Sequence, residues 1–319
     1  MCQTSRYINL FTDFGFKKIF GDQENTDLLK SLLNDILQFE GDKKIEEIVF
    51  KNGELLPDAP EDRKAIIDLM CEDGQGNQFI VELQKVSQEH FQSRALYYTS
   101  FPIQQQGIRG GWNFELAPVY FIGLLNFEID RFGDRVEYLH HGKITDIYTN
   151  RVMYDKLNMI YLEIPKLKKT KEELNSHLEW WIYIFQNLHM MTDIPKEIEN
   201  DIIKNTFDRA EFASMPKGEQ EKYHKNLKVY RDLINSVDFA YKEGVEVGIG
   251  QGIEQGIEQG IEIERLESNK KLKQEKLKSD KKLKQNKIEI AKNLLDILDD
   301  ETIAQKTGLS VEEIGALRG

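Results

Sequence analysis

Cysteine is scarce in this chain, since only Cys2 and Cys71 occur in 319 residues. One lies at the N-terminus and the other in a predicted hairpin, so we expect no stabilising disulfide, and neither has zinc-like spacing. There are only six histidines. The adjacent pair His140 and His141 would point to opposite faces of a strand, and we interpret both as surface residues.

Long apolar runs are also missing. No run reaches the length of a membrane span, and the N-terminus lacks the basic and then apolar segment of a secretion signal. We therefore expect a cytoplasmic protein with no membrane partner. A chain of this length can bury a sizeable core and can hold two domains plus an appendage.

The chain has fewer basic than acidic residues, with 43 Lys and Arg against 55 Asp and Glu, so its net charge is −12. Such a balance is unfavourable for DNA binding, in which phosphate neutralisation drives non-specific affinity. The charge is unevenly distributed, however. Residues 269–287 hold nine lysines against Glu275 and Asp280, a net charge of +7, so the rest of the chain carries −19. An acidic body with a basic segment is compatible with DNA binding, and equally with a solvated helix.

What the sequence does contain is a predicted β-hairpin over residues 65–84. Its two arms are rich in apolar and β-branched residues, and residues 73–77 (DGQGN) supply the turn chemistry between them. A three-residue loop with Gly76 in the left-handed conformation would place Asp68 directly opposite Glu82.

This register places two acids on one face of the hairpin. Directly opposed residues have Cβ atoms about 5 Å apart, and like charges there repel each other. Two carboxylates in apolar surroundings need a compensating cation, for which a divalent metal is the natural candidate. The alternatives are a solvated acidic face and a one-residue register slip, which would separate the acids. The predicted shared face contains Ile66, Asp68, Met70, Ile80, Glu82 and Gln84.

An Asp on one strand, followed across a tight turn by Glu-x-Lys on the next, is the signature of PD-(D/E)XK nucleases. Here the second element reads Glu82-Leu83-Gln84. Together with TDFGFKKIFGDQENTDLLKSLLNDIL (12–37) and SRALYYTSFPIQQQGIRGGWNFELAPVYFIGLLNF (93–127), it resembles the PD-(D/E)XK nuclease family transposases, or recombination-promoting (Rpn-like) nucleases. The resemblance covers residues 8–165 well and continues more loosely to the C-terminus. The ordered blocks are specific as a set, whereas the D…ExQ element alone is not.

The resemblance implies an α/β fold: a restriction-endonuclease-like core with a mixed central sheet. It also implies divalent-metal-dependent cleavage of DNA in recombination or transposition. Asp68 and Glu82 fall on the two metal-binding acids, and Asp13 falls on an acidic position that can complete the site. Gln84 stands where many members of the wider superfamily have Lys, although members of this group resemble one another in carrying Gln. A glutamine can orient water or phosphate by hydrogen bonds but brings no charge.

The residue types fit such chemistry. Carboxylate oxygens suit Mg²⁺ or Mn²⁺, and Mg²⁺ usually keeps several waters beside one or two protein acids and substrate phosphate. The positive charge that a lysine would supply has three candidate sources. Lys17 follows Asp13 by one helical turn, and Lys85 points to the opposite face unless its strand ends at Gln84. Arg94 lies on a helix expected over residues 88–105, where a phosphate contact and a surface role are open alternatives.

Other segments predict core and helical regions. The phenylalanines of residues 8–21 indicate core rather than a base-stacking platform, and residues 118–127 predict a strand buried on both faces. Thr170 with Glu173 forms a capping box, expected to open a helix that buries Trp181. We expect a nuclease-like core at 1–165, a helical subdomain at 166–242, a Gly-x-x-x repeat with a Lys-rich helical linker at 243–287, and a helix-turn-helix-like module at 288–319.

The glycine repeat spaces five glycines four residues apart from Gly244 to Gly260. On a helix these small residues would allow a second helix to approach closely, so the repeat predicts a homo-oligomer; the alternative is a flexible tether. In the last module Ser310 and Glu313 form a capping box. An interaction module is favoured there over DNA reading, because glutamates would face the phosphates.

Two functions from different classes follow. The first is a metal-dependent DNA endonuclease. The second is a catalytically inactive nuclease fold that binds DNA or oligomerises through its C-terminal helices.

Overall fold

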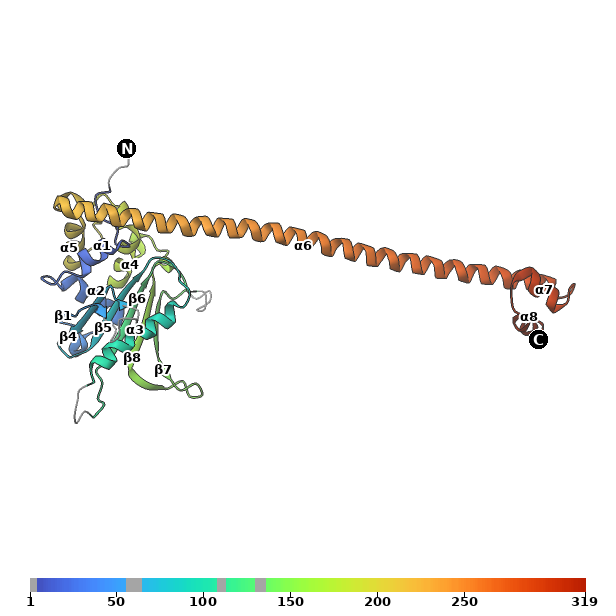
Figure 1. The fold of residues 1–319 in the computed structure, drawn as a ribbon, viewed down its shortest axis with the longest axis horizontal. Coiled ribbons are helices and arrows are strands. Elements are labelled where there is room, and N and C mark those ends of the chain that lie inside the picture. The colour runs from blue at the N-terminus through green and yellow to red at the C-terminus, as the bar shows by residue number, and fades with distance from the viewer. Residues whose placement is uncertain (1–4, 56–64, 108–112, 130–135) are drawn as a thin grey trace. The chain divides into compact units, whose positions relative to one another are not determined.

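The computed structural model describes residues 5–55, 65–107, 113–129 and 136–319 (Figure 1). The chain forms two compact units, residues 1–238 and 239–319. The finer division after residues 165, 242 and 287 stays a prediction.

The first unit is built on a mixed six-stranded sheet, which confirms the predicted α/β class. The central strands β5 (Gln78–Gln84), β6 (Val119–Leu125) and β8 (Val152–Glu163) are parallel, and the other neighbouring strands are antiparallel. A separate antiparallel pair joins β2 (Glu54–Leu55) to β3 (Ala65–Ile66). The order across the large sheet is β1 (Ile48–Phe50), β4 (Leu69–Asp73), β5 (Gln78–Gln84), β6 (Val119–Leu125), β8 (Val152–Glu163) and β7 (Leu139–Thr145).

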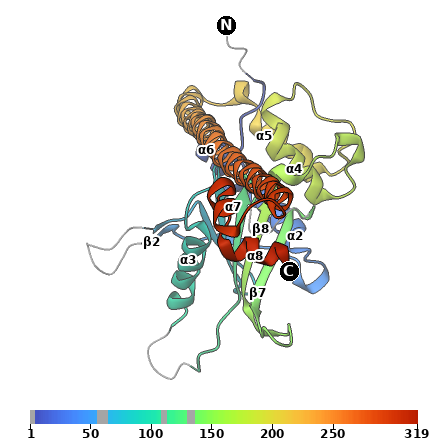
Figure 2. The same ribbon diagram turned by 90° about the vertical axis from the view of Figure 1, so that its right-hand side faces the viewer.

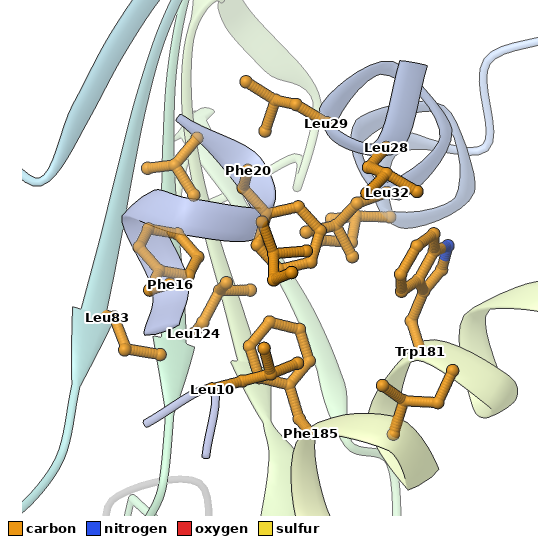
Figure 3. Close-up of a cluster of buried hydrophobic side chains, with 14 of the residues drawn as sticks. Leu10, Phe16, Phe20, Leu28, Leu29, Leu32, Leu83, Leu124, Trp181 and Phe185 are labelled. Atoms are coloured by element: carbon orange, nitrogen blue, oxygen red, sulfur yellow. The ribbon is translucent and has the colours of Figure 1, made fainter. Parts of the chain in front are cut away.

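The larger hydrophobic core lies on one face of this sheet, under several helices. Phe20 stacks on Phe185 with ring centroids 5.6 Å apart, and Trp181 meets Phe20 edge-on at 5.7 Å (Figure 3). The N-terminal phenylalanines are therefore core, as predicted. Figure 2 shows α2 (Asp27–Leu37), α4 (His177–Asn187) and α5 (Asp201–Ala210) on this side of the sheet and α3 (Phe91–Gln105) on the other. The helices of this layer are α1 (Asp13–Phe20), α2 (Asp27–Leu37), α4 (His177–Asn187) and α5 (Asp201–Ala210).

Helix α3 (Phe91–Gln105) covers the opposite face, over a smaller core. Phe91 packs edge-on against Tyr161 of β8, with ring centroids 5.9 Å apart. Gly123 of β6 makes room for both rings, because an added Cβ would lie 3.2 Å from Tyr161 and 3.3 Å from Phe91. Ile80 of β5 faces this core, so Glu82 and Gln84, two and four residues further along, lie on the face that α3 covers.

The helix predicted to open at Thr170 begins later than expected. The backbone N–H of Thr170 does donate to Glu173 Oε2 at 2.8 Å, as a capping box requires, but the box closes only a 3₁₀ turn. Helix α4 follows, after Ser176, whose hydroxyl accepts from the backbone N–H of Glu179 at 3.2 Å. The helix buries Trp181 completely, as predicted.

The second unit contains the C-terminal part of α6 (Lys217–Leu294), followed by α7 (Asp300–Thr307) and α8 (Val311–Arg318). Gly308 joins the two short helices with a φ of +69°, a conformation that favours glycine. Ser310 and Glu313 form the predicted capping box of α8. The core of this module is Ala291, Ile303, Leu309 and Ile314.

The glycine repeat is helical, because residues 244–260 lie inside α6. Each internal glycine costs about 1 kcal/mol relative to alanine. Among the described residues, nothing lies within 4 Å of a Cβ added to any of its five regularly spaced glycines, so none of these residues packs on the glycines to offset the cost. Within the described ranges no helix, α6 included, combines the length and apolarity that a bilayer span needs.

Candidate active site

The hairpin formed by β4 and β5 has the predicted register. Leu69 pairs with Val81, and Cys71 pairs with Phe79. Gly76 has a φ of +84°, as the three-residue loop requires. The register places Asp68 opposite Glu82, at a bend directly before β4 begins.

Reciprocal hydrogen bonds join the two acids to each other's backbone. The N–H of Asp68 donates to Glu82 Oε1 at 3.1 Å, and the N–H of Leu83 donates to Asp68 Oδ2 at 2.9 Å. Glu82 is buried, with 5% of its surface exposed, while Asp68 is half-buried. The hairpin therefore holds both carboxylates in defined positions near the edge of the α3-covered face.

A chain of polar side chains continues from Glu82 to α3. Gln84 Nε2 donates to Glu82 Oε2 at 3.2 Å, and Arg94 Nη2 donates to Gln84 Oε1 at 2.9 Å. Arg94 Nη1 also donates to Gln88 Oε1 at 2.6 Å, and the guanidinium lies over the Phe91 ring, 5.6 Å from its centroid. A positive charge thus lies behind Gln84.

The two acids have raised pKa values. Burial raises the pKa of Glu82 to about 8, and the neighbouring Asp68 charge adds to the shift. Burial also raises the pKa of Asp68, the hydrogen bond from Leu83 opposes the shift, and the charge of Asp13 adds to it. Buried adjacent carboxylates favour the protonated form, and a bound cation would favour the ionised form. The pair has the electrostatics of a site that gains from a divalent ion.

The raised pKa of Glu82 predicts a pH-dependent stability. Between about pH 4.5 and pH 8 the folded state holds a proton that the unfolded chain releases, so the free energy of unfolding falls as pH rises. Glu82→Gln removes the titrating group and with it this pH dependence. At pH 7 we expect the free energy of unfolding of the variant to exceed that of the wild type by on the order of 3 kcal/mol. Urea unfolding in EDTA, followed by tryptophan fluorescence at pH 4.5 to 8, measures the difference.

Glu72→Gln is the matched control on the same hairpin. A hydrogen bond from Gln78 holds the pKa of Glu72 below its ordinary value. Its replacement is therefore expected to lower stability at neutral pH. A Glu82→Gln difference that does not change with pH would contradict the assignment.

Asp13 lies close enough to influence Asp68 but is itself engaged. It begins α1, and its Oδ1 atom lies 3.2 Å from Lys17 Nζ. The charges of Lys17 and Lys85 lower the pKa of Asp68, so both lysines lie near that acid, and β5 does end at Gln84. No group of three or more His, Cys, Asp or Glu side chains is placed to hold a metal among the described residues. The structure brings together Asp68, Glu82 and Gln84, and the role of Asp13 as a third ligand stays a prediction.

Two carboxylates fit the ligand set of Mg²⁺ or Mn²⁺. Mg²⁺ in particular is often held by one or two protein acids, with waters and phosphate oxygens completing its shell. Tyr98, one turn after Arg94, also lies near the two acids. Burial raises the pKa of its hydroxyl, and the charges of Glu82 and Asp68 raise it further. The hydrogen bond from Arg94 to Gln88 and the position of Tyr98 near the two acids were not predicted, since both depend on how α3 packs.

The prediction for His140 is wrong, because its side chain is only 16% exposed. Its Nε2 atom lies 3.4 Å from Glu163 Oε2, and Lys166 Nζ lies 2.5 Å from the same oxygen. The buried Glu163 also accepts from the backbone N–H of Ile129 at 2.7 Å. A charge partner elsewhere in the chain thus draws one histidine of the pair inward, while His141 is exposed as predicted.

The sequence was compared with protein-family models, curated proteins and solved structures. The model for the PD-(D/E)XK nuclease family transposase matches residues 10–240. No curated protein and no solved structure gave a match. The family match includes the hairpin with Asp68, Glu82 and Gln84 as well as α3 with Arg94. The chain therefore belongs to the PD-(D/E)XK nuclease family transposases.

Proposed function

We propose that the protein is a divalent-metal-dependent DNA endonuclease that hydrolyses phosphodiester bonds in recombination or transposition. The observation that carries this proposal is the Asp68–Glu82 pair, held by reciprocal backbone hydrogen bonds on the hairpin. Family membership supports the same reading. DNA is the proposed partner, and α6 with its glycine repeat is proposed to join copies of the chain.

Asp68 and Glu82 would hold Mg²⁺ or Mn²⁺ through carboxylate oxygens. When bound, such an ion lowers the pKa of a coordinated water and offsets charge on the phosphate. The chain's own contribution is positional. The backbone of Leu83 fixes one Asp68 oxygen, and Gln84 holds Glu82 from the other side.

Arg94 is proposed to supply the positive charge that Gln84 lacks. Its two hydrogen-bond acceptors, Gln84 and Gln88, are neutral amides, and the guanidinium forms no ion pair with any described residue. Its charge acts on Glu82 from beyond ion-pair distance, where it lowers the pKa of that carboxyl. A fixed positive charge beside a buried carboxylate pair would attract the DNA backbone and offset charge that develops on phosphorus-bound oxygens.

Cleavage of supercoiled plasmid tests the proposal. We expect the purified full chain to nick or linearise DNA with Mg²⁺ or Mn²⁺, and to lose this activity in excess EDTA. Restoring the metal should restore cleavage. Binding without cleavage, across both metals and across duplex, single-stranded and branched DNA, would instead support the second function, a DNA-binding protein that acts through its C-terminal helices.

A further inference from the structure

Helix α6 carries an apolar stripe that no described residue of the second unit covers. Ile261, Leu272 and Leu283 are spaced eleven residues apart, which is three helical turns, so they lie along one side of the helix. Their exposed fractions are 62%, 61% and 57%. The C-terminal module covers a different side of α6, where Ala291 is completely buried. A regular line of exposed aliphatic side chains on a helix is typical of a helix–helix contact.

The charge of α6 is divided into two opposite blocks beside this stripe. Residues 242–268 carry seven glutamates against Lys242 and Arg265, a net charge of −5. Residues 269–287 carry a net charge of +7. Of the nine lysines in the basic block, Lys284 alone forms an ion pair among the described residues, with Glu313 at 2.7 Å. The blocks meet within one continuous helix, so neither can fold back on the other.

We infer that α6 pairs with α6 of a second copy of this chain in antiparallel orientation, with the two-fold axis at Leu272. The apolar stripe is symmetric about that residue. Leu272 then meets the partner's Leu272, and Ile261 meets the partner's Leu283. Both ends of the contact are equivalent, as a closed two-fold dimer requires.

The same register aligns charges of opposite sign on both flanks of the stripe. Glu264 and Lys282 are eighteen residues apart, five complete turns, so they lie on the same side of the helix. With the axis at Leu272, Glu264 lies beside the partner's Lys282, and Glu258 lies beside the partner's Lys287.

A parallel pair would instead place the acidic block against its own copy and the basic block against its own copy. Like charges repel, so the charge pattern disfavours that arrangement. Antiparallel pairing also buries Ile261, which follows the last glycine of the repeat. In this arrangement the isoleucines of the repeat, and not its glycines, contact the partner helix. This inference is independent of the proposed cleavage activity.

Disulfide crosslinking of the full chain separates the possible arrangements. The background is Cys2→Ser, and Cys71 is buried in the core. We expect Leu272→Cys to form a covalent dimer under mild oxidation. Leu283→Cys alone should not, because the two sulfurs would lie about 33 Å apart along the helices. Mixing Leu283→Cys with Ile261→Cys should give a crosslinked heterodimer. These positions are exposed, so the substitutions leave the core intact.

The charge pairing has its own test in sedimentation velocity. Glu264→Lys should raise the dimer dissociation constant about tenfold, since it turns two attractive contacts into repulsive ones. Adding Lys282→Glu on the same chain should restore the wild-type value. A monomeric wild type, crosslinking by Leu283→Cys alone, or no rescue by the paired reversal would each overturn the antiparallel dimer.

Discussion

The Asp68→Asn variant is expected to lose DNA cleavage by on the order of a thousandfold. The amide keeps the shape of the carboxylate and an oxygen that can accept a hydrogen bond from the Leu83 N–H. In the wild type this N–H donates to Asp68 Oδ2 at 2.9 Å. What it lacks is the negative charge that would hold a divalent ion beside Glu82. Initial rates of plasmid nicking at several Mg²⁺ concentrations measure the effect, and thermal unfolding verifies that the variant is folded.

Glu72→Gln provides the matched comparison for this experiment. It makes the same chemical change on the same hairpin, but Glu72 pairs with Lys51 at 3.1 Å and lies outside the proposed site. Its cleavage rate should stay within about twofold of the wild type. Equal rates for wild type and Asp68→Asn would exclude Asp68 from the chemistry and leave the nuclease proposal without its central residue.

The hairpin was predictable because its determinants are local. Period-two alternation fixes which side chains share a face, and one left-handed glycine, Gly76, fixes the loop and with it the register. Asp68 and Glu82 are consequently brought together as expected. Strand β6 was predictable for a related reason, since an almost continuously apolar run suits a parallel strand with helices on both faces.

The remaining parts of the site depend on contacts between distant elements. Nothing local in residues 88–98 indicates that Arg94 reaches Gln84, because this contact depends on how α3 packs over β5, β6 and β8. His140 was misassigned for the same reason. The alternation of side chains along a strand indicates which face His140 points to. It does not indicate that the buried acid Glu163, from another strand, lies beside His140.

Capping motifs proved informative about turns and less so about helix length. The box at Thr170 exists, yet only a 3₁₀ turn follows it, and Ser176 provides the second cap from which α4 begins. Helix α6 shows the opposite case. It continues from Lys217 to Leu294 through five regularly spaced glycines. Glycine lowers helix stability by a finite amount at each position but does not remove a backbone hydrogen-bond donor, as proline would.

Arg94→Met is expected to lower the cleavage rate about a hundredfold, with a smaller change in DNA binding. Methionine preserves the aliphatic packing over Phe91 but removes the charge and both hydrogen bonds to glutamine. Lys51→Met, which removes the cation that pairs with Glu72 outside the proposed site, should leave the rate within about twofold. Single-turnover rates, measured beside DNA affinity in Ca²⁺, separate the chemical step from binding.

Adding Gln84→Lys to Arg94→Met distinguishes a role in charge from a role in packing. A lysine at position 84 would bring an ammonium group directly beside Glu82, in the place where the wider superfamily carries its motif lysine. If the arginine acts by charge, the double variant should recover at least about tenfold of the lost rate. If Arg94 only supports the packing of α3, the second substitution cannot help. It would instead remove the amide that now contacts Glu82, and the rate should fall further. Recovery would thus show that a positive charge on α3, that of Arg94, does the work that a lysine at position 84 of β5 can also do.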